Sequence, residues 1–83
     1  MVGKKLTFVE VKKKIEEHVE IALGIKDFSI TFAKYVEYGN IWKVNIEYDQ
    51  LIGGLKFPTS AAFSIDAETG ELREYFKGRQ WSD

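Results

Sequence analysis

The sequence contains no cysteine and a single histidine, so disulfide frameworks, thiolate chemistry and structural zinc sites are excluded. It contains no apolar run near the roughly 20 residues that a membrane-spanning helix requires. The formal net charge of −1 gives no overall attraction to nucleic acid or to an anionic membrane. No apolar stretch of signal-peptide length follows the first lysines. A soluble, cytoplasmic protein without a membrane span is therefore expected.

The composition favours a folded domain. The chain has 83 residues, of which 45% are hydrophobic and 14% aromatic. Disordered chains combine low hydrophobicity with high net charge, and this chain has neither. A single domain over residues 1–83 is predicted.

The first element is predicted from a local capping signal. Thr7 and Glu10 have the spacing of a capping box, in which each side chain accepts a hydrogen bond from the other residue's amide. Gly24 is suited to the position after a helix C-terminus. Apolar residues recur between them at helical spacing: Phe8, Val11, Ile15, Val19, Ala22 and Leu23. A helix over residues 8–23 is predicted.

Four later segments alternate apolar and polar residues, as strands with one buried face do. Gly39-Asn40 and Asp66–Gly70 are predicted turns, and Asp49–Lys56, which holds Gly53-Gly54, is predicted to be a flexible loop. The last strand is expected from Glu71 to about Arg79. This order predicts an α+β fold: an N-terminal helix packed on a four-stranded antiparallel meander sheet, cystatin-like in outline.

The alternation also predicts which residues share a face of the sheet. The predicted buried face comprises Phe28, Ile30, Phe32, Trp42, Val44, Ile46, Ala61, Phe63, Ile65, Leu72 and Phe76. The predicted solvent-exposed face comprises Thr31, Lys43, Asn45, Glu47, Ser64, Arg73, Tyr75 and Lys77.

Three carboxylates crowd into the segment Asp66–Glu71, which raises the question of an ion site. An EF-hand calcium loop needs glycine at its sixth position and glutamate at its twelfth. Counted from Asp66, glycine falls at the fifth position and Lys77 at the twelfth. A structural turn fits better, because Asp66 can accept amide hydrogen bonds two residues on and Gly70 supplies a positive φ.

No arrangement of residues points to catalysis. His18, the only histidine, lies on or near the apolar stripe of the predicted helix, where a packing role is expected. No Ser–His–Asp order or phosphate-cradling glycine loop is present, and Gly53-Gly54 lacks the lysine and helix of a P-loop. A non-enzymatic protein is predicted, with no catalytic residue, no metal ligand and no cofactor.

Two sets of residues are candidates for binding a partner. The first set shares one parity on the predicted last strand and its continuation: Arg73, Tyr75, Lys77, Arg79 and Trp81. Cations interleaved with aromatic residues can bind single-stranded nucleic acid, although an ordinary exposed strand has the same appearance. The second set is the aliphatic trio Leu51, Ile52 and Leu55 in the predicted loop. It either covers the open end of the core or binds a partner, and at least one of the three is expected to be exposed.

Two family resemblances bear on function. The segment Trp42-Lys43-Val44-Asn45-Ile46-Glu47, followed by Pro58 and by Phe63-Ser64-Ile65-Asp66 with Gly70-Glu71-Leu72 and Tyr75, resembles gas vesicle protein O over about half of the chain. That resemblance implies a non-enzymatic accessory protein of vesicle assembly. The Asp66–Glu71 turn also resembles PepSY domains, small modules that are often extracytoplasmic and inhibit peptidases.

The predicted function is a small non-enzymatic protein-binding or assembly module, with another protein or a second copy of the chain as partner. A PepSY-like inhibitory or ligand-binding module is the alternative, and a single-stranded nucleic-acid binder comes third.

Overall fold

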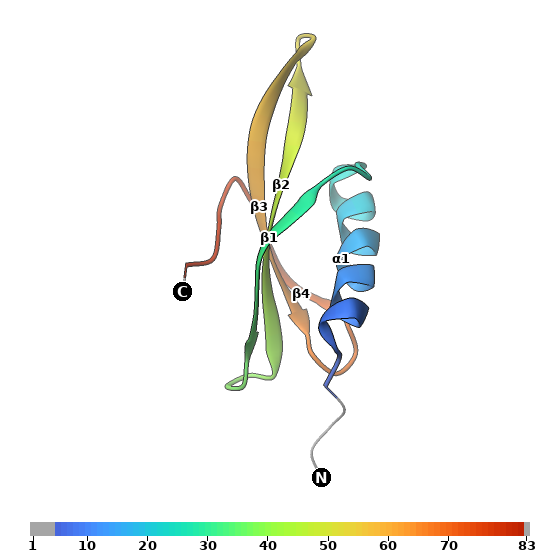
Figure 1. Ribbon diagram of the computed structural model, residues 1–83, viewed down its shortest axis with the longest axis vertical. Helices are drawn as coiled ribbons and strands as arrows, with labels where there is room; N and C mark the ends of the chain where they lie inside the picture. The colour runs from blue at the N-terminus through green and yellow to red at the C-terminus, as the bar shows by residue number, and fades with distance from the viewer. Residues whose placement is uncertain (1–4, 83) are drawn as a thin grey trace.

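The computed structural model describes residues 5–82. The elements in chain order are α1 (Phe8–Leu23), β1 (Ser29–Val36), β2 (Ile41–Ile52), β3 (Leu55–Asp66) and β4 (Leu72–Lys77). The strands form one antiparallel sheet in the order β1-β2-β3-β4, and α1 lies along one face of it (Figure 1). The predicted α+β arrangement of a helix and a four-stranded meander is confirmed.

Helix α1 has the predicted bounds and the predicted cap. The Thr7 amide donates to Glu10 Oε1 at 2.9 Å, and the Glu10 amide donates to Thr7 Oγ1 at 3.3 Å. Gly24 ends the helix with a φ of +68°, a left-handed conformation that glycine adopts without strain. Within the described residues, no helix is long and apolar enough to cross a membrane.

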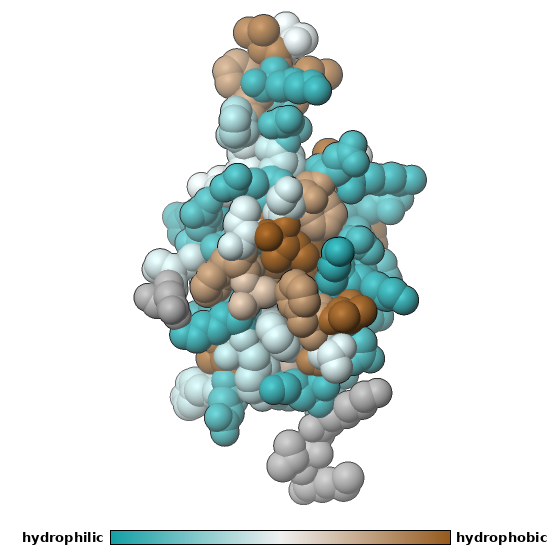
Figure 2. All heavy atoms as spheres, viewed as in Figure 1, coloured by the Kyte–Doolittle hydropathy of each residue, from teal (hydrophilic) through white to brown (hydrophobic). Residues whose placement is uncertain are grey.

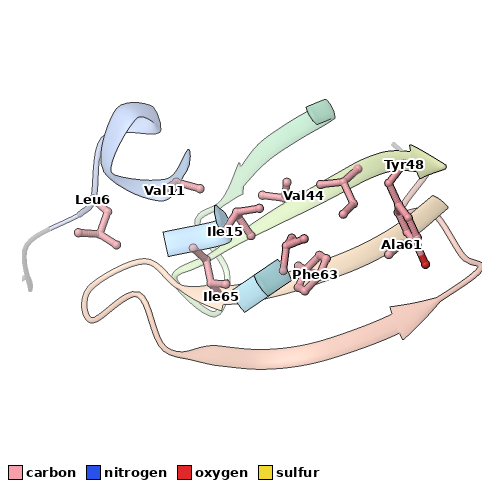
Figure 3. Packing of buried hydrophobic residues seen from close by; sticks show 10 residues of the cluster. Leu6, Val11, Ile15, Val44, Tyr48, Ala61, Phe63 and Ile65 are labelled. Carbon is pink, nitrogen blue, oxygen red and sulfur yellow. The ribbon is translucent and has the colours of Figure 1, made fainter. Parts of the chain in front are cut away.

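The core lies between α1 and the face of the sheet that it covers (Figure 3). Val11, Ile15 and Val19 of α1 are fully buried against it. Their partners on the sheet are Val44, Ile46, Ala61, Phe63 and Ile65. Burying one such aliphatic side chain stabilises the fold by about 1.5–3 kcal/mol, so this seam holds the helix in place.

A β-bulge in each edge strand changes which residues share a face. In β1 the register shifts between Ile30 and Phe32, and in β4 it shifts opposite Ser64 and Ile65. An extra residue reverses the alternation beyond it. Phe32 therefore pairs with Asn45, and Phe76 pairs with Ala62, on the face away from α1. The prediction that both phenylalanines belong to the helix-facing core is wrong.

The bulge in β4 also moves Tyr75, from the predicted open face to the helix-facing side of the sheet. It pairs with Phe63 on the helix-facing side, and their ring centroids lie 5.0 Å apart. The prediction of Tyr75 on the open face is wrong for the same reason, the bulge at Arg73. The open face is also not wet at its centre, because Asn45 and Ser64 are both buried there.

The predicted flexible loop over Asp49–Lys56 is wrong as well. These residues continue β2 and β3 into a long hairpin, which extends beyond the end of α1 (Figure 1). Only Gly53 and Gly54 form the turn, with φ of +58° and +82°. Positive φ at both central positions is what a two-residue type I′ hairpin turn requires, so the glycine pair makes a tight turn and not a loose loop.

Candidate protein-binding surfaces

The Asp66–Gly70 segment is a structural turn, as predicted. Asp66 Oδ1 accepts from the amides of Glu68 and Thr69 at 2.8 and 3.1 Å, and its Oδ2 accepts from Arg73 at 3.0 Å. The backbone N–H groups of Glu68 and Thr69, and after them Arg73, hold the pKa of Asp66 below its usual range. Both oxygens of the Asp66 carboxylate therefore have hydrogen-bond partners in or beside the turn. The described residues contain no group of three or more histidine or acidic side chains placed to hold a metal ion.

Helix α1 holds this turn against the sheet. His18 Nε2 donates to the carbonyl oxygen of Gly70 at 2.8 Å, which gives the single histidine a structural partner. A Cβ at Gly70 would lie 2.8–2.9 Å from the side-chain carbons of Lys14. Glycine is needed there both for this close approach and for its φ of +81°.

The aliphatic trio lies at the tip of the β2–β3 hairpin, where apolar side chains gather at the end of the molecule (Figure 2). The exposed fractions are 67% for Leu51, 55% for Ile52, 64% for Leu55 and 45% for Phe57. All three predicted residues are exposed, so the alternative in which they cover the core is wrong. Phe57 is not among the predicted residues, because it lies just beyond the expected loop and before the alternation that begins at Ala61.

The pleat places these residues on two sides of the hairpin. Side chains alternate along a strand, and Ile46 and Ala61 point toward the core. By that alternation Ile52, Leu55 and Phe57 lie on the core side, where they prolong the apolar surface past Tyr48. Leu51 lies on the opposite side with its neighbour Lys56. The residues 48–60 are called the distal hairpin below.

The two outer edges of the distal hairpin differ. Ile52 and Leu55 flank a two-residue turn and exchange hydrogen bonds, so the backbone groups of Leu51, Asp49 and Pro58 point outward. Pro58 has no N–H, which blocks pairing along the β3 edge. On the β2 edge, pairing with β1 stops at Glu47, and within residues 5–82 no strand covers Asp49 and Leu51. One edge is therefore open to a further strand and the other is obstructed.

A cleft adjoins the open edge, where β1 diverges from the hairpin. It has a volume of about 300 Å³ and lies between the α1–β1 connection and the strands β2 and β3. Its walls are formed by Asp27, Phe28, Ser29, Glu47, Tyr48, Asp49 and Pro58. These walls carry acidic and no basic side chains, so the cleft favours backbone or basic groups of a partner.

The stripe of cations and aromatic residues predicted on the last strand does not exist as one surface. Strand β4 ends at Lys77, short of the predicted Arg79, and Trp81 lies beyond the turn at Gly78. Arg73 is bound to Asp66, while Tyr75 faces the core beside Phe63. Lys77 is exposed opposite Ala61, and Arg79 lies over the ring of Phe76 at 5.7 Å, on the other face. The five side chains are divided between the two faces of the sheet.

The C-terminal segment covers the face of the sheet away from α1 (Figure 1). Asn45 Nδ2 donates to the Trp81 carbonyl at 2.9 Å, and Asn45 Oδ1 accepts from the Trp81 amide at 2.7 Å. The indole N–H of Trp81 donates to the Phe63 carbonyl at 2.8 Å, and its ring meets Phe76 edge-on at 5.8 Å. Asn45 was assigned to the wet face by the alternation, and nothing local signals a partner so distant in sequence.

The structure therefore presents two features that bear on binding: the exposed distal hairpin with its open edge, and the far face that Trp81 occupies. Comparisons with protein families, with characterised proteins and with solved structures found no match for the chain.

Proposed function

We propose that this chain is a small non-enzymatic protein-binding module that assembles through its distal hairpin, with a second copy of the chain as the partner. The observation that carries the proposal is the open edge of β2 at Asp49 and Leu51, next to four exposed apolar side chains. An extended strand adds to such an edge through main-chain hydrogen bonds, and neighbouring side chains add apolar contact. The distal hairpin extends beyond the end of α1, so the helix does not block a partner from its edge (Figure 1).

A second copy fits the edge by two-fold symmetry, the commonest symmetry of soluble oligomers. When two β2 edges pair antiparallel about Gln50, Asp49 of each copy lies opposite Leu51 of the other. Both residues direct their N–H and C=O groups outward, so the two pairs can exchange hydrogen bonds. In this register Ile52 lies opposite Tyr48 of the other copy, which covers apolar area at about 25 cal/mol per Å².

The remaining edges explain why such pairing closes at a dimer. A hairpin with two open edges could add copies without limit, whereas Pro58 obstructs one of them. Strands β1 and β4, at the outer edges of the sheet, each contain a bulge, a feature that discourages edge pairing. The similarity of the motifs around Trp42 and Asp66 to gas vesicle protein O is in keeping with an assembly role.

Two substitutions of Leu51 separate the contribution of its backbone N–H to self-association from that of its side chain. Leu51→Pro removes the outward N–H, and Leu51→Ala removes most of the side chain but keeps the N–H. Light scattering over a concentration series should show that the wild type self-associates and that Leu51→Pro abolishes this. The alanine variant should only weaken it. Pro58→Ala should open the second edge and give assemblies larger than dimers.

The proposal is wrong if the wild type stays monomeric across the series, or if proline and alanine at position 51 have equal effects. Circular dichroism melts of all variants serve as the folding control, because residue 51 is exposed and distant from the core.

A further inference from the structure

The far face of the sheet holds Trp81 through contacts that are separate from the distal hairpin. Asn45 is only 4% exposed, yet its whole carboxamide is used on the backbone of one residue, Trp81. A carboxamide that donates to a C=O and accepts from the N–H of the same residue imitates a neighbouring strand. This contact recognises an extended backbone of any sequence, so the choice of residue must come from the slot around the side chain.

That slot suits tryptophan. The Phe63 carbonyl accepts the indole N–H, a donor that phenylalanine lacks and that tyrosine presents at a different place. Phe76 meets the ring edge-on, and Lys43 Nζ lies 4.7 Å from the ring centroid, within the range of a cation–π interaction. An aromatic residue without the N–H would lose this hydrogen bond to the Phe63 carbonyl.

The segment that fills the slot is attached to the domain mainly through Trp81, with one further contact from Arg79, whose guanidinium lies over the ring of Phe76. Gly78, with a φ of +77°, turns the chain out of β4, and its amide donates to the Ser60 carbonyl at 2.7 Å. Beyond it Arg79, Gln80 and Ser82 are exposed, and none of residues 78–82 belongs to a strand. Segments held by so few contacts open at a small fraction of the cost of global unfolding.

We infer that the far face of the sheet is a recognition site for an extended peptide segment bearing a tryptophan, and that residues 78–82 occupy it as a tethered ligand. A short tether keeps such a ligand at an effective concentration of about millimolar. A tryptophan-bearing segment of a partner protein therefore takes the site only when it binds tightly enough to displace the chain's own residues. This site is separate from the distal hairpin and does not depend on the assembly proposed above.

The test uses the full chain with Trp81→Ala, which leaves Asn45 and the slot in place. The probe is a fluorescein-labelled peptide with the sequence Gly-Arg-Gln-Trp-Ser-Asp, and binding is followed by fluorescence anisotropy. It should bind Trp81→Ala at least tenfold more tightly than it binds the wild type. The same peptide with alanine for tryptophan should not bind, and Asn45→Asp combined with Trp81→Ala should abolish binding. Ile52→Asp combined with Trp81→Ala should bind the peptide normally, which separates this site from the hairpin.

A folded Trp81→Ala chain that shows no saturable binding up to about 1 mM peptide, the effective concentration of the tether, would overturn the inference. If Trp81→Ala does not fold, the wild type still decides the matter. Unlabelled peptide at several times that concentration should then shift the NMR signal of the Trp81 indole N–H toward its displaced position, while the Asn45 side-chain amide, bound to the tryptophan of the peptide instead, keeps its signal. An unchanged Trp81 signal would show that Trp81 is only a structural cover.

Discussion

Asn45 and Trp81, 36 residues apart in the sequence, are joined by two hydrogen bonds of 2.9 and 2.7 Å through the Asn45 side chain. This pairing gives the sheet a cover on the face away from α1, so both faces are buried at the centre. The apolar alternation alone would leave that face in water. The arrangement can be tested by replacing the asparagine.

Asn45→Asp should release the C-terminal segment. An aspartate can still accept from the Trp81 amide, but it cannot donate to the carbonyl, and its charge is buried beside that oxygen. The expected cost is about 1–3 kcal/mol. For a domain of this size each kcal/mol lowers Tm by about 4–8 °C. Limited trypsin digestion with mass spectrometry should show faster cleavage after Arg79.

Glu74→Gln provides the control, since Glu74 is an exposed residue on the same face of the sheet. It should change neither Tm nor the rate of cleavage. Equal cleavage rates in Asn45→Asp and the wild type would show that Asn45 does not hold the segment.

Tyr48→Phe should stabilise the protein. The Tyr48 hydroxyl is buried and has no hydrogen-bond partner among residues 5–82. Removing a buried group that lacks a partner recovers its desolvation cost, here about 1 kcal/mol. Tm should rise by roughly 4–8 °C at neutral pH. Tyr38→Phe, at a position 93% exposed, is the matched control and should change nothing.

Alkaline pH should widen this difference. Burial, and after it the neighbouring Tyr75, raises the pKa of Tyr48 above its ordinary value. Because the folded-state pKa is the higher one, Tyr48 ionises more readily in the unfolded chain. Its titration leaves the free energy of unfolding unchanged below about pH 10 and lowers it as the pH rises toward the folded-state value. Tyr48→Phe should lose less stability over that range. Tm values for Tyr48→Phe at or below wild type would contradict the assignment of an unpaired hydroxyl.

Asp66→Asn and Asp66→Ala should separate the charge from the hydrogen bonds of the turn. Asparagine keeps the acceptor for the Glu68 and Thr69 amides, whereas alanine removes it. Alanine should cost about 1 kcal/mol at pH 7, comparable to the loss of a helix cap, and asparagine less. Thermal melts at both pH 7 and pH 2 provide the measurement.

The pH dependence of Tm shows whether the charge of Asp66 stabilises the fold. The pKa of Asp66 is lowered in the folded state, so its charge stabilises the fold above about pH 4 and this contribution is lost as the pH falls through the lowered value. The gap in Tm between wild type and Asp66→Asn should therefore be smaller at pH 2 than at pH 7. A gap that stays constant would mean that the charge of Asp66 contributes nothing.

Substitutions of Gly53 can distinguish a tight turn from a flexible loop. Asparagine tolerates the positive φ of +58° at this position, and Asn-Gly is a favoured type I′ turn. A β-branched valine is strained there by about 1–2 kcal/mol. Gly53→Asn should protect the Leu55 amide from hydrogen exchange as well as the wild type does, and Gly53→Val should expose it. Identical protection in the two variants would favour a loop.

The parts of the fold that were predicted correctly depend on local signals. The capping box of Thr7 and Glu10, the spacing of Val11, Ile15 and Val19, and the Asp66 turn each lie within a few residues, so the sequence displays them directly. Such signals also set the order of the strands, because short connections join antiparallel neighbours.

The features that were predicted wrongly depend on single residues or on distant pairs. One bulge residue in β1 and one in β4 exchange the faces of Phe32, Tyr75 and Phe76, and alternation cannot show an insertion of one residue. The pair Gly53-Gly54 is equally consistent with a loop and with a type I′ turn. The contact between Asn45 and Trp81 forms only after the sheet has assembled.

The central claim, assembly through the distal hairpin, is tested most directly by sedimentation velocity on the wild type and Ile52→Asp over about 10 µM to 1 mM. The wild type should shift from monomer to dimer with concentration. Ile52→Asp should remain monomeric with an almost unchanged Tm, because Ile52 is exposed and lies outside the core. A wild type that is monomeric throughout, or an Ile52→Asp variant that dimerises as the wild type does, would contradict the claim.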